Sequence, residues 1–135
     1  MRSVSSNAHS SVTWAMADTH LSIRLDLANG DRIGPGKIAL LEAIRAKGSI
    51  SAAARQLGMS YRRAWLLVEQ INEALREPAV RAATGGQHGG GAVVTPVGER
   101  MIDLYRSIEG LARTSAHQEF RAIARLVRHG ERARD

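Results

Sequence analysis

Hydrophobic residues recur at helical spacing along much of the chain. Residues 37–47 carry Ile38, Leu41 and Ile44, with Leu40 beside them, and predict an amphipathic helix that ends at Gly48. Residues 60–75 predict a second helix that ends at residues 76–78, since residue 77 precedes a proline. Its apolar row has spacings of four, three and four: Ala64, Val68, Ile71 and Leu75. Trp65 flanks this row, and we assign it to the core.

A short helix is expected between these two, in the sequence GSISAAARQLGMSYRRAW. Ser49 and Ser51 are both candidate N-caps for it, and Gly58 suits its C-terminus. Ser60 can cap the helix that follows. Helix, glycine turn and helix form the helix-turn-helix plan, in which the second helix enters the major groove of DNA. An ordinary helical hairpin with solvated arginines is the alternative.

Alternating patterns predict strands on both sides of this unit. Residues 21–27 alternate apolar and polar side chains, Asn29-Gly30 is a turn signal, and residues 31–33 are the expected return strand. Pro35 suits the first turn of the next helix. After the second helix, residues 80–83 and 92–95 can pair as an antiparallel hairpin, which is the wing of a winged helix-turn-helix.

The tip of this wing is rich in glycine and holds Gln87 and His88. No Lys-Ser/Thr follows it and no helix begins directly after it, so the pattern of a nucleotide-binding P-loop fails. Glycine here instead allows backbone amides to approach DNA phosphates or the minor groove. His88 has no neighbouring Cys or His, and we interpret it as polar rather than as a metal ligand.

A long helix is expected after the wing, with Thr95 as its N-cap and Pro96 at its first position. Its apolar row follows the spacing of a coiled-coil seam and predicts dimerisation: Val97, Met101, Leu104, Ile108 and Leu111. Such a row can also close the domain's own core, but the length of the helix favours pairing with a second copy. The row lapses at residues 113–119, where either the helix kinks or Thr114 or Ser115 caps another helix.

These elements predict a mainly α chain with a small β component, a winged helix-turn-helix with a long C-terminal dimerisation helix. Residues 1–20 are rich in Ser, Ala, Asn and Thr without apolar periodicity, and we expect a flexible leader. Residues 21–112 form the predicted winged helix-turn-helix DNA-binding domain. Residues 113–135 are expected to form a C-terminal helical extension and a basic tail.

Composition narrows the class of protein. The chain has 135 residues, 44% of them hydrophobic, and a formal net charge of +6, as expected for one globular domain with a basic surface. Cysteine is absent, which excludes thiol catalysis and cysteine-ligated zinc. No apolar run approaches the roughly 18 residues of a membrane span, and the first residues lack the apolar segment of a signal peptide. We therefore expect a cytoplasmic protein without a membrane partner.

Catalysis is not expected. Acidic residues are scattered, and Ser, His and Asp are not arranged around a nucleophile elbow. The prediction is therefore a chain that is not an enzyme, with no small-molecule substrate and no metal site.

Charge placement instead favours DNA. Residues 45–63 contain Arg45, Lys47, Arg55, Arg62 and Arg63 and no acid, whereas a solvated surface usually mixes signs. Arg62 and Arg63 are the candidates for base or phosphate contact, and their adjacency leaves open which one faces the bases. The candidate DNA-binding residues in the helix-turn-helix are Lys47, Ser49, Arg55, Ser60, Tyr61, Arg62 and Arg63. Those in the wing tip are Thr84, Gly85, Gly86, Gln87, His88 and Gly89.

Three segments together resemble a known family. They are residues 48–51, residues 58–61 with Ala64-Trp65, and the wing from Arg81 to Thr95 with its sequence ATGGQHGGGAVVT. The combination resembles the N-terminal DNA-binding domain of the ModE family of molybdate-responsive transcriptional regulators, over roughly residues 21–111. The helix-turn-helix alone is also similar to that of LysR-type regulators, but the glycine-rich wing is specific to the ModE resemblance.

The resemblance implies a homodimer on double-stranded DNA, with dimer contacts from the first and last helices. It also implies that the helix from Ser60 reads bases and the wing holds phosphates. Full-length members carry C-terminal molybdate-binding modules, for which these residues leave no room, so no cofactor is expected in this chain. Gln87-His88 is neutral where the family often has lysine, which should weaken phosphate attraction there.

Two alternatives to a sequence-specific regulator remain open. One is a protein-interaction module that heterodimerises with a larger regulator through the C-terminal helix. The other is a non-specific nucleoid or RNA binder, although RNA-stacking modules usually display several aromatics on one surface and this chain has few.

Overall fold

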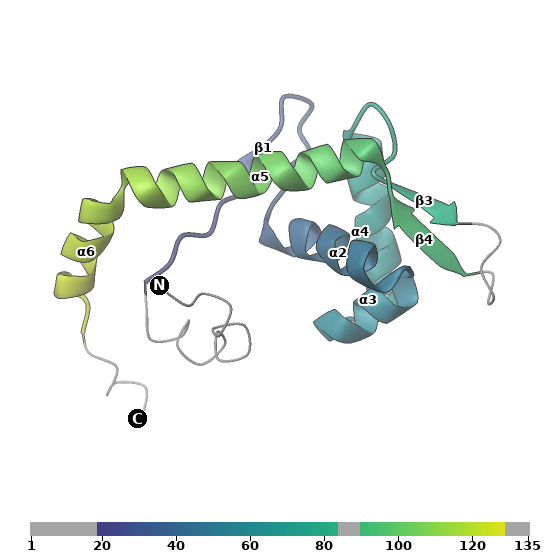
Figure 1. The fold of residues 1–135 in the computed structure, drawn as a ribbon, viewed down its shortest axis with the longest axis horizontal. Helices are drawn as coiled ribbons and strands as arrows, with labels where there is room; N and C mark the ends of the chain where they lie inside the picture. The colour runs from purple at the N-terminus through teal and green to yellow at the C-terminus, as the bar shows by residue number, and fades with distance from the viewer. Residues whose placement is uncertain (1–18, 84–89, 129–135) are drawn as a thin grey trace. The chain divides into compact units, whose positions relative to one another are not determined.

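The computed structural model describes residues 19–83 and 90–128, which belong to two compact units. Of the described residues, 22–83 and 90–108 belong to the larger unit, and 19–21 and 109–128 belong to the other. The elements in chain order are β1 (Leu25–Asp26), β2 (Arg32–Ile33), α2 (Pro35–Lys47), α3 (Ile50–Leu57), α4 (Tyr61–Ala74), β3 (Val80–Ala83), β4 (Gly91–Val94), α5 (Pro96–Ser115) and α6 (His117–Leu126) (Figure 1). This order confirms the predicted winged helix-turn-helix.

Two serines and a glycine shape the helix-turn-helix of α3 and α4. The Ser49 side chain accepts a hydrogen bond from an α3 amide, and the Ser60 side chain accepts one from an α4 amide, so each serine caps its helix. Gly58 ends α3 with a φ of 71°, in the left-handed region that favours glycine. Of the two serine candidates Ser49 is therefore the cap, and Ser51 instead accepts a hydrogen bond from Arg55.

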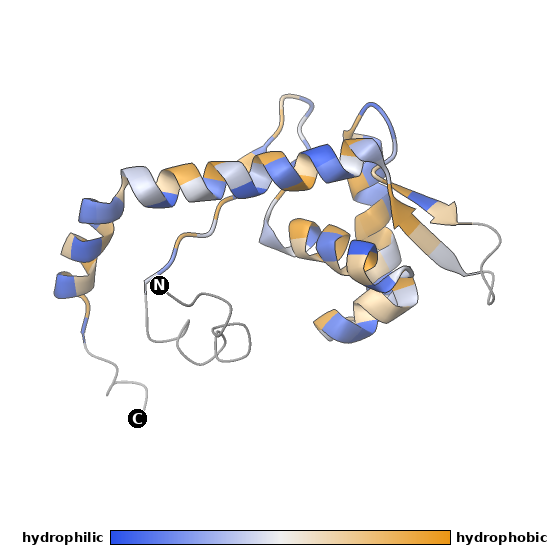
Figure 2. Ribbon diagram, viewed as in Figure 1, coloured by the Kyte–Doolittle hydropathy of each residue, from blue (hydrophilic) through white to orange (hydrophobic). Residues whose placement is uncertain are grey.

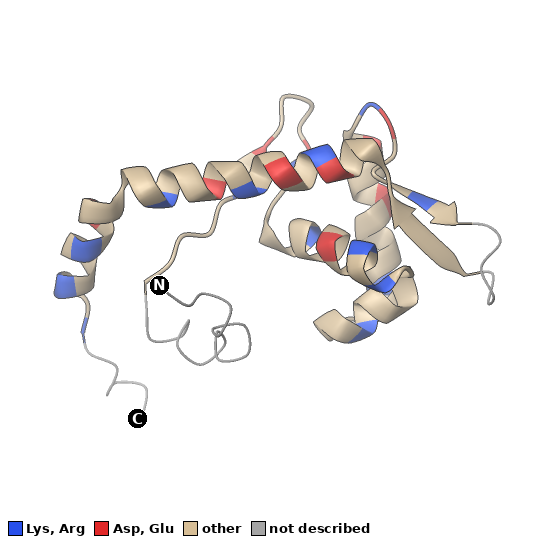
Figure 3. Ribbon diagram, viewed as in Figure 1, with Lys and Arg blue, Asp and Glu red and all other residues tan. Residues whose placement is uncertain are grey.

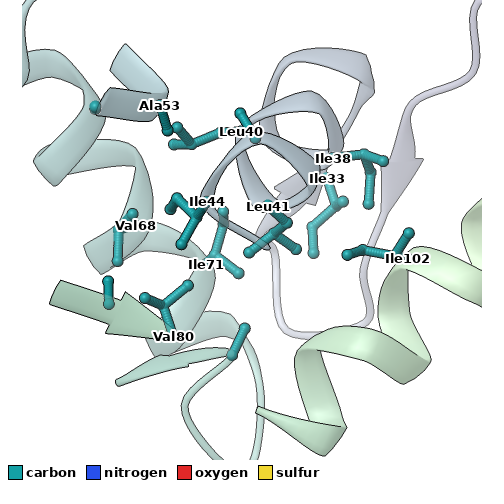
Figure 4. Close-up of a cluster of buried hydrophobic side chains, with 14 of the residues drawn as sticks. Ile33, Ile38, Leu40, Leu41, Ile44, Ala53, Val68, Ile71, Val80 and Ile102 are labelled. Carbon is teal, nitrogen blue, oxygen red and sulfur yellow. The ribbon is translucent and has the colours of Figure 1, made fainter. Parts of the chain in front are cut away.

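The core of the larger unit lies where α2 packs against α3 and α4. Leu40, Leu41 and Ile44 of α2 are completely buried, and Ile71 of α4 meets them from the other side (Figure 4). Coloured by hydropathy, the helices show apolar and polar residues on different faces (Figure 2). The cluster also includes Ile33, Ile38, Ala53, Ala64, Val68, Val80, Ile102 and Tyr105. The apolar rows predicted for α2 and α4 are thus confirmed as core.

Several predicted boundaries differ from the structure. The hairpin before α2 is shorter than expected, because only Leu25 with Ile33 and Asp26 with Arg32 are paired. Helix α4 ends at Ala74, before residues 76–78, since the backbone at residue 75 is already extended. Strand β4 is shifted by one residue from the predicted 92–95, because it begins at Gly91 and the residue that follows it, Thr95, caps α5.

The part of α5 that belongs to the larger unit, residues 96–108, is held to the rest of that unit by polar contacts. The Tyr105 hydroxyl donates to the carbonyl of Ile23 at 2.6 Å, and Arg106 donates to both carboxylate oxygens of Glu42 at 2.7 and 2.9 Å. Figure 3 shows both signs of charge along α5. Ile102 and Tyr105 carry the buried face of α5, and Met101 of the predicted dimerisation row packs beside them against the core.

The ion pair of Glu42 and Arg106 should make a pH-dependent contribution to the stability of the fold. The hydrogen bond from Arg106 is the main cause that holds the pKa of the Glu42 carboxyl below its ordinary 4.5, against the opposing effect of burial. A depressed pKa means that the stabilisation is present above about pH 4.5 and is lost as the pH falls through the lower folded value. The melting temperatures of the native chain and Arg106→Met should therefore converge in acid, and a gap independent of pH would contradict the assignment.

The long C-terminal helix is interrupted. Helix α5 continues through Ser115, and α6 begins at His117 after Ala116, whose φ and ψ are −101° and 20°. Ala116 occupies the N-cap position without a side-chain hydrogen bond, so neither Thr114 nor Ser115 is the cap. The break expected within residues 113–119 is present, but it is a local change of backbone conformation rather than a serine or threonine cap.

Candidate nucleic-acid interface

Helix α4 presents its side chains in distinct directions because successive residues are about 100° apart. The buried row on the core side is Ala64, Val68 and Ile71. Arg62 and Leu66 lie roughly opposite this row by that spacing, and Glu69 lies nearby. All three of these side chains are exposed, and they border one shallow hollow at the first turns of the helix. The outward face of α4 therefore combines an arginine, an apolar side chain and an acid.

A second side of α4 faces the wing. Tyr61 and Trp65 line a hollow of about 320 Å³ together with residues 80–82 of β3 and residues 90–92 at the start of β4. Trp65 is 43% exposed, so its assignment to the core is wrong. Its position is about 100° from that of Ala64, which places the indole at the border between the core and the surface.

The third side of α4 faces the β1–β2 hairpin and the start of α2. Arg63 lines a hollow of about 240 Å³ with Arg24, Arg32 and Lys37. The Lys37 ammonium donates to the carbonyl of Arg32 at 2.7 Å, and Arg24 pairs with Asp26 at 2.9 Å. Cations from several elements thus gather beside Arg63, whereas Arg62 points away from the domain.

The predicted DNA-contacting cations are exposed, namely Lys47, Arg55, Arg62 and Arg63. Over residues 19–83 and 90–128, no ion pair joins Arg62 or Arg63 to an acid. Arg45 differs, because it pairs with Glu99 of α5 at 2.7 Å, and this contact holds the pKa of its guanidinium above the ordinary value. Two adjacent arginines at the start of α4 are therefore available to a ligand.

The wing is joined to the helix-turn-helix through its backbone. Strands β3 and β4 pair in antiparallel register from Val80 with Val94 to Ala83 with Gly91. The amide of Ala92 donates to the carbonyl of Gly48 at 2.8 Å, which fixes β4 beside the start of α3. The predicted tip residues Thr84, Gly85, Gly86, Gln87, His88 and Gly89 lie outside the described residues.

Asn72 positions the wing, and we did not identify it from the sequence. Its side-chain oxygen accepts hydrogen bonds from the amides of Ala79 and Val80 at 2.8 and 3.1 Å, and its amide donates to the carbonyl of Val80 at 3.2 Å. One half-buried side chain on α4 thus satisfies three backbone groups where β3 begins. An asparagine in a helix shortly before a predicted strand was the available signal.

Replacing Asn72 by alanine should lower the free energy of unfolding by about 1–3 kcal/mol, because buried backbone groups of the wing lose their partners. Denaturant unfolding of Asn72→Ala against the native chain measures this loss. Asn72→Asp keeps an acceptor but loses the donor to Val80, and we expect it to lose less. A native-like stability of Asn72→Ala would show that the contacts contribute nothing.

The predicted dimerisation row lies on α5 and has two parts. Leu104, Ile108 and Leu111 are 44%, 40% and 65% exposed, whereas Val97 and Met101 are half-buried and Met101 packs against the core. The exposed part of the row carries large apolar side chains without cover from the described part of the chain. Its role in pairing stays a prediction.

Other kinds of site find no support in the described ranges. No cluster of three or more acidic or histidine side chains there is suited to hold a metal ion. Within the same residues, no helix combines the length and the apolar character needed to cross a membrane.

The fold and this surface define the class of protein. A capped helix-turn-helix is followed directly by a β-hairpin and a long helix, and that hairpin is bonded to both the turn before α3 and the side of α4. The chain is a winged helix-turn-helix protein.

The known proteins with similar sequences belong to a narrower group within this class. The chain is 54% identical over 80 residues to the molybdenum-pterin-binding protein MopB of Rhodobacter capsulatus. The matched region covers 59% of this chain and 30% of MopB. It is 45% identical over 71 residues to the DNA-binding transcriptional dual regulator ModE of Escherichia coli, which covers 53% of this chain and 27% of ModE. The molybdenum transport protein ModE of Azotobacter vinelandii is 39% identical over 85 residues, or 63% of this chain and 32% of that protein. No family model matches the chain.

These relatives identify the chain as a homologue of the ModE and Mop proteins, matched over the N-terminal region of ModE-like proteins. The resemblance drawn from the turn and wing residues is thereby confirmed. The chain spans about a third of the length of the curated relatives that it matches. The names of these relatives describe regulators, a transport protein and molybdenum-pterin-binding proteins rather than enzymes.

Proposed function

We propose that this chain is a sequence-specific DNA-binding regulator of transcription, which inserts α4 into the major groove and lays its wing on the backbone or the minor groove. The observation that carries the proposal is the first turn of α4. Arg62 and Arg63 are exposed there, and within the described residues neither is paired with an acid. The N-terminal residues of a recognition helix are those that meet base edges.

The directions of the two arginines assign them different roles. Arg62 points outward from α4, so its guanidinium is placed to bind the edge of a guanine. Arg63 lies with Arg24, Arg32 and Lys37, a concentration of positive charge that suits a backbone phosphate. The remaining contacts in this proposal come from Lys47, Ser49, Arg55, Ser60, Tyr61 and the wing-tip residues 84–89.

The names of the relatives support DNA binding and a link to molybdenum. The Escherichia coli relative is named a DNA-binding transcriptional dual regulator, and the Rhodobacter capsulatus relatives are named molybdenum-pterin-binding proteins. We therefore infer that the regulated genes concern molybdenum. No molybdate site is proposed within this chain.

The exposed row on α5 supports a homodimer. Leu104, Ile108 and Leu111 continue the heptad spacing of a helix pair, and burial of such side chains drives association. Two copies would then address half-sites about one helical turn of DNA, roughly 34 Å, apart. The same row favours a second candidate function, which is heterodimerisation with a larger regulator.

One experiment tests the function and the choice of partner. Duplexes selected from a random library by the purified chain should contain a repeated half-site, and the affinity for the selected duplex should fall steeply as salt rises. Sedimentation velocity should give a dimer, and the variant Leu104→Glu with Ile108→Glu should give a monomer with weaker binding.

Three outcomes count against parts of the proposal. Equal competition by bulk DNA would indicate a non-specific nucleic-acid binder. A monomeric chain that pairs only with a longer regulator would favour the second candidate function. Failure of selection with a folded dimer would remove the DNA-binding proposal itself.

A further inference from the structure

We infer that Trp65 and Leu66 form a contact surface for the 5-methyl groups of thymine, so that the operator of this protein contains thymines opposite these side chains. This inference rests on the proposed function and adds the base that the middle of α4 recognises.

Its first support is the exposure of two apolar side chains of α4, Leu66 on the outward face and Trp65 between that face and the wing. Trp65 is 43% and Leu66 is 48% exposed, and both border the same hollow as Arg62. Single exposed apolar side chains are common on protein surfaces, but neighbouring ones that are rimmed by polar residues, as here, are typical of an interaction site.

The second support is their spacing. Arg62, Trp65, Leu66 and Glu69 stand at positions i, i+3, i+4 and i+7, which lie together on one side of a helix. A recognition helix that places Arg62 against a base edge in the major groove therefore brings Trp65 and Leu66 to neighbouring base pairs.

The third support is chemical complementarity. Thymine carries the C5-methyl group, the apolar feature in the major groove that side chains contact to recognise it. Arg62 and Arg63 line the same hollow at the N-terminal end of the apolar pair, and Arg81 lines the adjoining hollow on the side of the wing. In the major groove, a thymine methyl group lies between phosphates. This arrangement complements an apolar centre with cationic edges better than an apolar protein surface would. Glu69 also lies in the hollow, and a carboxylate is compatible with the edge of a cytosine.

Exchange of thymine for deoxyuridine tests the inference, because it removes only the methyl group. Each thymine of a selected operator is replaced in turn, and the dissociation constant is measured by fluorescence anisotropy with the full chain. For at least one thymine in each half-site we expect the constant to rise roughly three- to fivefold, as for the loss of one buried methyl group. The same exchange outside the footprint should change nothing.

Protein variants locate the contact. In Leu66→Ala or Trp65→Ala, the penalty for deoxyuridine at the matching position should disappear, while Leu126→Ala, which removes an 84% exposed leucine from α6, should keep the full penalty. Circular dichroism melting confirms that each variant is folded.

Two results would overturn the inference without touching the proposed function. One is an operator that binds tightly and is insensitive to deoxyuridine at every position. The other is a change of oligomeric state in Leu66→Ala by sedimentation, because the patch would then be a contact between copies of the chain. A folded dimer that selects no duplex would instead remove both proposals.

Discussion

Replacing Arg62 and Arg63 together by alanine should raise the dissociation constant for the selected operator by roughly thirtyfold or more. A bidentate contact between arginine and guanine contributes about 1–3 kcal/mol of discrimination, and a second lost cation adds to this. Both side chains are exposed, and neither is paired with an acid in the described part of the chain, so the loss should come from binding rather than from folding. Gel-shift titration at fixed salt measures the effect.

The single variants separate the two roles. Arg62→Ala should relax the preference for one base pair, whereas Arg63→Ala should weaken all sequences alike and reduce the slope of affinity against salt by about one. The double variant Arg121→Ala with Arg125→Ala removes the same charge from α6 and is the matched control. If both double variants lose affinity equally, the effect is general attraction, and the first turn of α4 does not read the operator.

Gly98→Ala should destabilise the domain by about 1–3 kcal/mol, since a methyl group at this position overpacks a buried site. A Cβ built on Gly98 would lie 2.5 Å from the carbonyl oxygen of Ala79 and 2.6 Å from a methyl carbon of Val94. Ala79 directly precedes β3 and Val94 ends β4, so a shift that relieves either contact would move the base of the wing. Thermal and denaturant unfolding measure the change.

Gly110→Ala is the matched control, because Gly110 lies in the same helix and a Cβ there meets no atom within 4 Å. That substitution should be neutral or should stabilise the helix by up to about 1 kcal/mol. If Gly98→Ala lowers the stability and Gly110→Ala raises it, close packing rather than helix propensity requires glycine at residue 98. Equal effects would contradict this reason.

The sequence predicted the local parts of this fold well because the signals are local. Ser60, Gly58 and Thr95 are caps whose chemistry acts within one turn of helix, and each has the predicted role. The buried rows of α2 and α4 follow directly from the spacing of apolar residues. Such features need no knowledge of which elements are neighbours.

The errors arise where a residue is defined by a distant partner. Trp65 was assigned to the core from its residue type, but its environment depends on how the wing stands beside α4. Asn72 looks like an ordinary helical residue until β3 is placed next to it. The core face of α5 was missed for the same reason, since Tyr105 is buried through a contact with Ile23, far away in the sequence.

The two attachments of the wing have a consequence for DNA shape. Asn72 bonds the start of β3 to α4, and Gly48 bonds β4 to the turn before α3, so the base of the hairpin is fixed relative to α4. The distance between the base of the hairpin and α4 is therefore fixed. If α4 and the wing bind one duplex as proposed, that duplex must match the fixed separation. Sequences whose grooves are stiff or of the wrong width would then cost deformation energy at base pairs that no side chain touches.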